Sequence, residues 1–406
     1  MIKRWLLIGA GIAAGLGVLV RVITSPAVAT PPKPFPSPVI APKFATGANR
    51  WRVAWTVPTP DVSDVSLSTD GQNVAWTDSK GCVRRLRSDS GRMLWRTAPL
   101  SGVNHVVAAP DGSVAAYSRL NPDRNSVVLL HPLHGELKSR IFAGDGAVWS
   151  AAFDMNSVAF IGTGGRMVYE VRNPSREKSP VLTDGVPESL VVASDASRIA
   201  LGTWSRAGVL SCSLAGKQPC WRRVEPDADR ACRVAVSADG SRVLVLSIRG
   251  ANETEGMVRV HDGKTGALLW EVRLPEGASQ PTALLSASGE YVAVTYRRSA
   301  AVANSDDWRL AYFDAEGNRL FSDKGSALFR PIIAAVAADG ATITVRNADD
   351  TLFTLDRRGN FVAKMRLSDE KTLKPFVIKD ISSSLDGRTL LLERRDGQLT
   401  LLRNGA

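Results

Sequence analysis

Short apolar segments recur along residues 50–406, and most of them end at a turn in which a small or acidic residue precedes glycine. The segments either alternate apolar and polar residues or are apolar throughout, which is typical of half-buried and fully buried strands. Asp-Gly and Ser-Gly dipeptides between two such segments favour β-hairpins. The pattern therefore predicts a chain of hairpins and argues against a helical bundle.

The turn returns along the whole body of the chain. It stands at Asp70-Gly71, Asp111-Gly112, Asp239-Gly240, Ser288-Gly289, Asp339-Gly340 and Asp386-Gly387, with degenerate copies at Asp154-Met155 and Asp195-Ala196. A second turn follows later in each unit, as at Ser90-Gly91 and Thr265-Gly266. Each unit of about 45 residues then contains four antiparallel strands, a sheet that buries both faces only by stacking on its neighbours. The repeats predict an all-β fold, an eight-bladed β-propeller, with seven blades as the alternative.

The ends of the body suggest how the ring closes. The last unit reaches its second turn at Asn404-Gly405, where the sequence ends before a fourth strand. Residues 51–56 (WRVAWT) are similar to the fourth strands around Trp95 and Trp270. We expect this amino-terminal strand to complete the last sheet, because closure removes an exposed sheet edge.

Residues 261–270 (HDGKTGALLW) resemble the repeat signature of quinoprotein-type (PQQ-repeat) propellers, and residues 88–95 (SDSGRMLW) are a second copy. A looser copy is present at residues 215–221, and the Ser-x-Asp-Gly turns resemble those of WD-repeat proteins equally well. The resemblance implies a propeller whose tryptophans pack between neighbouring sheets. Quinoprotein dehydrogenases of this group hold a quinone with an adjacent cysteine pair and calcium. The four cysteines here are not adjacent, and the loop excursions expected at residues 249–257 and 297–307 are only of medium length, so we predict no cofactor.

The amino terminus has the features of an export signal. Lys3 and Arg4 precede 16 uncharged residues (5–20), and Ala27-Val28-Ala29 has the form of a signal-peptidase site. Residues 1–29 are predicted to be a signal peptide or a single-pass membrane anchor helix, residues 30–49 a Pro-rich linker and residues 50–406 the propeller. Both alternatives place the body on the periplasmic, extracytoplasmic side of the cytoplasmic membrane, anchored or secreted.

Charge and composition change this picture little. The 406 residues carry a formal net charge of +11, spread over scattered arginines without a dense basic block, so we predict no nucleic-acid partner. A Gly-x-Ser-x-Gly motif is absent, and the pair His131 and His134 has no third metal ligand nearby in the sequence. We therefore predict no catalytic residue and no metal site, and an enzyme is not expected.

One set of positions is a candidate for binding. Residues six positions before each first turn are expected at one mouth of the axial channel, and most are polar. Asp64, His105, Arg233 and Asp380 are among them. We add Trp308, with Trp149 and Trp204, as exposed aromatic anchors, since aromatic and arginine side chains carry much of the energy of interfaces. The alternative is that these positions are only solvated strand ends.

Cys212 and Cys220 flank a predicted hairpin turn, so a disulfide between them is possible, with two unpaired thiols as the alternative. Together the observations predict a non-enzymatic scaffold that binds other envelope proteins through one face of the ring, as a monomer within a complex. It would contact the membrane only through an uncleaved amino-terminal segment. The alternatives are a quinoprotein-like or lyase/lactonase-type propeller enzyme, and a sensor of a small ligand.

Overall fold

The computed structural model describes residues 51–119, 126–142, 147–164, 167–171, 181–182, 185–204, 208–214, 220–224, 230–249, 255–275, 278–298, 307–324, 331–347, 349–367 and 377–405. Within these ranges the regular structure is entirely β-strand, and no helix capable of crossing a membrane is present among them. The predicted signal or anchor helix (residues 1–29) and the Pro-rich linker lie outside the described residues.

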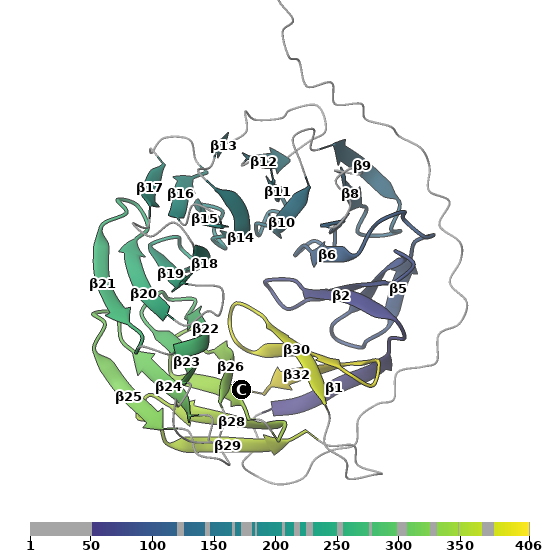
Figure 1. Ribbon diagram of the computed structural model, residues 1–406. Coiled ribbons are helices and arrows are strands. Elements are labelled where there is room, and N and C mark those ends of the chain that lie inside the picture. The colour runs from purple at the N-terminus through teal and green to yellow at the C-terminus, as the bar shows by residue number, and fades with distance from the viewer. Residues whose placement is uncertain are drawn as a thin grey trace, which may run out of the picture.

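The described strands form eight four-stranded antiparallel sheets, which we number as blades in chain order (Figure 1). Blade 1 contains β2 (Val62–Leu67), β3 (Asn73–Asp78), β4 (Val83–Arg87) and β5 (Met93–Arg96). Blade 2 contains β6 (His105–Ala108), β7 (Val114–Tyr117), β8 (Ser126–Leu130) and β9 (Leu137–Phe142). Blade 3 contains β10 (Val148–Phe153), β11 (Ala159–Thr163), β12 (Met167–Val171) and β13 (Val181–Leu182). Blade 4 contains β14 (Val186–Val192), β15 (Arg198–Trp204), β16 (Gly208–Ser213) and β17 (Trp221–Val224).

The second half of the ring repeats the same meander. Blade 5 contains β18 (Arg230–Val236), β19 (Arg242–Arg249), β20 (Glu255–Asp262) and β21 (Leu268–Arg273). Blade 6 contains β22 (Ala278–Leu285), β23 (Val292–Arg298), β24 (Asp307–Phe313) and β25 (Arg319–Lys324). Blade 7 contains β26 (Ile332–Val336), β27 (Thr342–Arg346), β28 (Thr351–Asp356) and β29 (Phe361–Arg366). Blade 8 contains β30 (Ile378–Ser383), β31 (Thr389–Arg394), β32 (Gln398–Asn404) and β1 (Trp51–Pro58).

Blade 8 closes the ring with strands from both ends of the body. Strand β1 pairs antiparallel with β32, from Trp51 opposite Asn404 to Pro58 opposite Gln398. This pairing confirms the prediction that an amino-terminal strand completes the last sheet. The physical reason is that β32 would otherwise present an unpaired edge at the outside of the ring.

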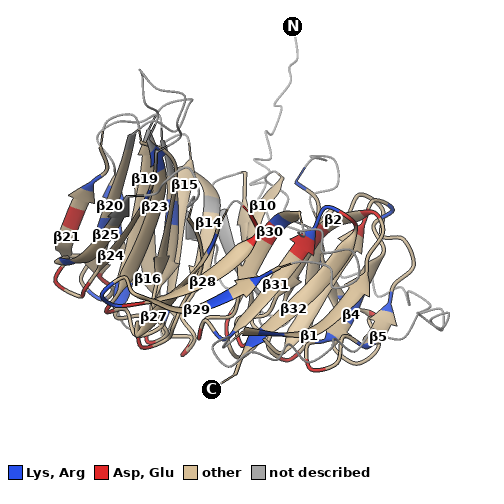
Figure 2. Cartoon of the chain, turned by 90° about the horizontal axis from the view of Figure 1, so that it is seen from below, with Lys and Arg blue, Asp and Glu red and all other residues tan. Residues whose placement is uncertain are grey.

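The first strand of each blade, which we call the inner strand, lies next to the central channel, and the fourth, the outer strand, forms the outer wall (Figure 1). All inner strands start on one face of the ring, which we call the entry face. The first and second turns of the blades lie on the opposite face, the turn face, where many acidic residues gather (Figure 2). These turns connect the blades: Ala238 N donates to Ala287 O (2.8 Å), Ser288 N to Ala338 O (2.9 Å) and Leu385 N to Thr69 O (2.9 Å).

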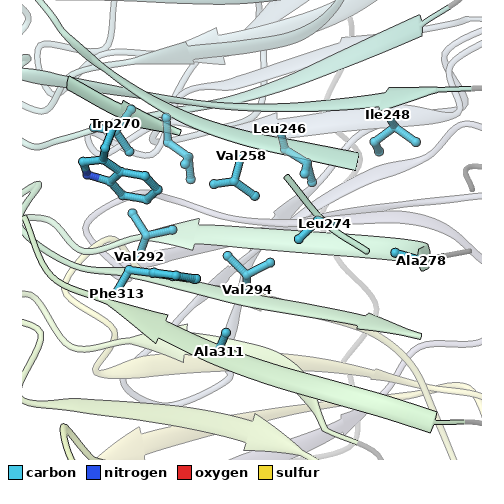
Figure 3. Close-up of a cluster of buried hydrophobic side chains, with 12 residues drawn as sticks. Leu246, Ile248, Val258, Trp270, Leu274, Ala278, Val292, Val294, Ala311 and Phe313 are labelled. Atoms are coloured by element: carbon cyan, nitrogen blue, oxygen red, sulfur yellow. The ribbon is translucent and has the colours of Figure 1, made fainter. Parts of the chain in front are cut away.

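Outer-strand tryptophans join neighbouring blades. The indole of Trp95 in blade 1 donates to Pro132 O in blade 2 (2.9 Å), and a Cβ on Gly135 would lie 2.5 Å from its ring. Trp270 in blade 5 makes the same contact with blade 6, inside an apolar cluster that includes Val292 and Phe313 (Figure 3). These contacts confirm that the tryptophans of the repeat pack between blades. The turn glycines are required because a side chain there would overlap the indole.

The structure shows only the ends of the two expected loop excursions, because residues 250–254 and 299–306 lie outside the described residues. Strands β19 and β20 stay paired as far as Arg249 opposite Glu255, and β23 and β24 as far as Arg298 opposite Asp307. Both hairpins lengthen their blades toward the entry face, because the polar residues there continue the ladder hydrogen bonds of the sheet.

Candidate functional site at the entry face

The structure places most of the predicted binding residues on the entry face, near the start of inner strands. Asp64 lies on β2, His105 on β6, Arg233 on β18 and Asp380 on β30. Asp64 and His105 are neighbours across blades 1 and 2, whereas Arg233 lies in blade 5, elsewhere around the ring (Figure 1). The predicted positions therefore share a face, but they do not all form one local site.

The expectation for Trp308 is wrong in one respect. This residue lies on β24, the third strand of blade 6, opposite Arg297 in the ladder, and its side chain is half-buried. It is on the same end of the sheet as the start of β22 but farther from the channel. Trp149 is also half-buried, and Trp204 alone of the three expected aromatic anchors is exposed, at 50 %.

Asp64 connects two blades. Its carboxylate accepts a hydrogen bond from the backbone N–H of Val106 (2.9 Å) and lies 3.2 Å from Nδ1 of His105, both in blade 2. In blade 4, Ser189 accepts from the backbone N–H of Val234 in blade 5 (3.1 Å) in the same way. An inner strand has no strand partner on its channel side, so its N–H groups need other acceptors. Asp64 and Ser189 thus have a structural task, which explains why they interrupt apolar strands.

His105 is held on a second side by an aromatic ring. It stacks on Tyr117 with ring centroids 5.5 Å apart and planes inclined by 26°. Burial raises the pKa of Tyr117, so this phenol stays neutral at physiological pH. Among the described residues, the imidazole of His105 contacts a carboxylate and a phenol but no thiol or serine hydroxyl that it could activate.

Carboxylates gather where blade 8 meets blade 1. Burial raises the pKa of Glu393 on β31; the hydrogen bond from Lys379 Nζ (2.6 Å) opposes this shift, and the nearby charges of Asp380 and Asp64 add to it. In the described part of the chain, no set of three or more His, Cys, Asp or Glu side chains is placed to hold a metal ion.

The register of the inner strands contains a feature that the sequence pattern did not reveal. In six inner strands the ladder shifts near the entry face, for example between Val62 and Asp64, Val148 and Ser150, and Ile378 and Asp380. The residue passed over is a β-bulge, which bends the strand and turns its side chain away from the ladder. Trp149 and Lys379 occupy such positions. A bulge leaves no mark in a two-residue period, so sequence alone does not locate it.

The bulge at Trp149 brings it to a tryptophan of the next blade. The ring centroids of Trp149 in blade 3 and Trp204 in blade 4 are 6.3 Å apart, with planes inclined by 34°. Trp204 ends β15, opposite Val186 at the start of β14, so the pair lies on the entry face. We call Trp149 and Trp204 the aromatic pair. It is an apolar feature that spans two blades on the face that also carries Asp64, His105 and Arg233.

The structure joins Cys212, on β16, to Cys220, just before β17, in a disulfide with Cα atoms 4.1 Å apart. The remaining cysteines, Cys82 and Cys232, are buried thiols. The disulfide spans the second turn of blade 4 and therefore lies on the turn face, away from the aromatic pair.

Comparison with known proteins supports the fold more than any activity. Residues 206–385, less than half of the chain, match the family described as outer membrane protein assembly factor BamB. No curated protein matches the chain in sequence. Among solved structures, the Dos1 propeller is similar over 88 % of this chain and 97 % of its own, with 12 % identity and a TM-score of 0.61.

Two further structures share this architecture at similarly low identity. The C-terminal WD40 domain of Sif2 is similar over 89 % of this chain and 100 % of its own, with 10 % identity and a TM-score of 0.60. Hydrazine synthase of Kuenenia stuttgartiensis is similar over 85 % of this chain and 96 % of its own chain, with 11 % identity and a TM-score of 0.53. The chain thus folds as a β-propeller of the PQQ-repeat and WD-like kind.

Proposed function

We propose that this protein is a non-enzymatic propeller scaffold on the outer side of the cytoplasmic membrane, and that it binds partner proteins through its entry face. The aromatic pair carries the proposal. Trp204 is 50 % exposed although it lies against Trp149, and an indole in this position offers a large apolar surface and a hydrogen-bond donor to a partner. Tryptophan is also among the residue types that dominate the binding energy of protein interfaces.

The same face also carries polar groups on the inner strands of blades 1, 2, 5 and 8, which could add polar contacts to a partner that covers several blades. Arg233 and Asp380 are exposed, and Asp64 and His105 are half-buried. Asp64 is already engaged between blades 1 and 2, so its effect on a partner would come mainly through its charge and through the position of His105.

The proposed location rests on two observations of different kinds. The matching family is named for an outer membrane protein assembly factor, a role in the cell envelope. The Cys212–Cys220 disulfide is suited to an oxidising compartment outside the cytoplasm. A scaffold role agrees with the site, where the described side chains offer contacts but no nucleophile paired with a base.

Site-specific photocrosslinking in intact cells tests the proposal. A photoreactive amino acid is placed at Trp204, at Gln280, which is exposed on the entry face, and at Leu133, which is 67 % exposed in the second turn of blade 2. We expect the first two positions to capture the same envelope protein and position 133 not to capture it. Equal capture from all three positions, or capture from position 133 alone, would contradict the choice of face.

The non-enzymatic part is tested separately by incubating the purified protein with pyrroloquinoline quinone and calcium. A ligand that binds the native state raises the melting temperature. We expect no change, and an increase of several degrees at micromolar quinone would instead indicate a quinoprotein-like enzyme.

A further inference from the structure

The outer wall of the ring is strongly biased toward positive charge. Among the exposed side chains described on outer strands, nine are cationic and one, Glu271, is acidic. The cations are Arg52, Arg96, Lys138, Arg222, Arg223, Arg273, Arg319, Lys364 and Arg366. Acidic side chains concentrate instead on the turn face, as Figure 2 shows. The two charge types are thus separated between the wall and one end of the ring.

Blades 6 and 7 add exposed apolar side chains to this wall. Leu320 is 38 % exposed, Phe361 57 % and Val362 37 %. Leu320 and Val362 are bulge residues, because the ladder passes directly from Phe321 to Arg319 and from Ala363 to Phe361. The bulges turn both side chains outward, where they also prevent pairing of these edges with another strand.

Cations lie directly beside these apolar side chains. On β29, Lys364 and Arg366 are exposed, and Lys364 lies over the ring of Phe353 at 5.4 Å. On β25, Arg319 is exposed next to Leu320. We call Arg319, Leu320, Phe361, Val362, Lys364 and Arg366 the wall patch. Among the side chains described on β25 and β29, none is acidic.

Two carboxylates at the turn-face end of the patch have partners in their own turns. Asp314 accepts from the backbone and the amide of Asn318, and Asp356 does the same with Asn360. Lys364 and Arg366 lie farther along β29, away from these two turns.

The chain enters the folded body next to the wall patch. Trp51, the first residue of β1, packs in the same apolar cluster as Met365 of β29 and Ile378 of blade 8. The residues before it include the uncharged run 5–20, which the sequence predicts to be a signal or an anchor. Insertion of that run into a bilayer would keep the neighbouring wall at a high effective concentration near the lipid surface.

We propose that the wall patch lies on the anionic phospholipid surface of the membrane into which residues 5–20 insert. This rests on the anchored form of the proposed location, but not on the choice of the entry face for partners. Lys and Arg contact the phosphates, while Leu320, Phe361 and Val362 reach the boundary of the acyl chains, a combination typical of interfacial membrane binding. The wall is roughly perpendicular to both faces of the ring, so a partner on the entry face would remain accessible.

A quenching experiment with the full chain tests the proposal. The protein is reconstituted into vesicles of phosphatidylcholine, with or without phosphatidylglycerol, that contain a lipid-attached quencher. A fluorophore is carried by Val362→Cys or, as a matched control, by Leu133→Cys in blade 2, both exposed apolar positions. We expect phosphatidylglycerol to increase quenching at position 362 and not at position 133. Quenching that is equal at both positions, or that is unaffected by phosphatidylglycerol, would overturn the proposal.

A second measurement separates the wall patch from the anchor. Full-length Leu6→Asp/Leu7→Asp is titrated with phosphatidylglycerol vesicles, with and without Lys364→Ser/Arg366→Ser. Each Lys or Arg at an anionic surface raises the affinity for vesicles about fivefold. We therefore expect Lys364→Ser/Arg366→Ser to weaken vesicle binding about 30-fold. A change of less than about threefold, with the variant folded by circular dichroism, would refute the proposal. Photocrosslinking from Trp204 should be the same in both proteins, which distinguishes failure here from failure of the proposed function.

Discussion

Removal of the Trp55 indole should open the ring where its two ends meet. Trp55 is 1 % exposed, and its Nε1 donates to Ser88 O in blade 1 at 2.8 Å. A Cβ on Gly91 would lie 2.8 Å from the indole, so the turn of blade 1 fits closely over it. Truncation of a buried aromatic side chain to alanine costs about 3–5 kcal/mol, and we expect Trp55→Ala to lower the free energy of unfolding by this amount.

Two tryptophans serve as controls. Trp95 is 4 % exposed and makes the same contact between blades 1 and 2, so Trp95→Ala should cost a similar free energy. Trp204 is half-exposed, and Trp204→Ala should cost less than about 1 kcal/mol. Urea unfolding gives these values, provided that the slope with urea is unchanged among the variants.

Hydrogen exchange distinguishes closure from packing. In Trp55→Ala, the amides of β1 should lose protection before the rest of the ring, because β1 is then held mainly by its ladder with β32. In Trp95→Ala the changed residue lies on β5, which the chain holds in place on both sides. Strand β1 should therefore keep its protection from hydrogen exchange in this variant. A cost below about 1 kcal/mol for Trp55→Ala, or unchanged exchange in β1, would refute the reasoning.

Three further predictions follow from single contacts. Gly91→Ala should destabilise the protein by more than Gly397→Ala, measured by thermal unfolding, since both glycines have a left-handed backbone (φ 66° and 74°) but only a Cβ at position 91 would overlap an indole. Burial opposes ionisation of Asp78, but hydrogen bonds from Cys82 N and from Arg84 outweigh this effect and lower the pKa of Asp78. The ionised carboxylate therefore stabilises the folded protein above pH 3.8, and this stabilisation is lost as the pH falls through the folded pKa. Asp78→Asn should therefore cost about 3 kcal/mol at pH 7, because it leaves the buried Arg84 without its counter-ion, and the difference from the wild type should shrink in acid unfolding curves below about pH 4. Replacement of Cys212 and Cys220 by serine should lower the free energy of unfolding by about 2–3 kcal/mol, and dithiothreitol should then have no further effect on the melting curve; equal melting of variant and wild type would contradict a stabilising disulfide.

Some parts of the candidate site could be predicted from the sequence. The position of Asp64, His105, Arg233 and Asp380 on one face follows from their constant distance to the first turn, because strands of equal length place equal positions at equal heights. The aromatic pair could be predicted only in part. The sequence singles out Trp149 and Trp204, but only the bulge in β10 and the stacking of blades 3 and 4 bring them together.

Other parts depended on contacts between blades. Trp308 has the same chemical character as Trp204, and sequence does not reveal that its strand is the third of its blade and that its side chain is half-buried. The task of Asp64 was also not evident, because its hydrogen-bond donor, Val106 N, belongs to the next unit. An acidic residue in an apolar strand indicates that its carboxylate has a hydrogen-bond donor or a cation as a partner. The sequence does not show which neighbouring residue supplies that partner.

The sequence by itself determined the unit and its closure. Turn glycines, alternating strands and the tryptophan after the second turn of blades 1, 4 and 5 are local requirements of a hairpin and of the indole that packs over it, so they leave a recurring pattern in the chain. Only the tertiary structure decided which side chains face a neighbour and which face solvent. Those outcomes depend on the radial place of each strand and on bulges that shift the ladder by one residue, and a shift of this kind changes exposure without changing composition.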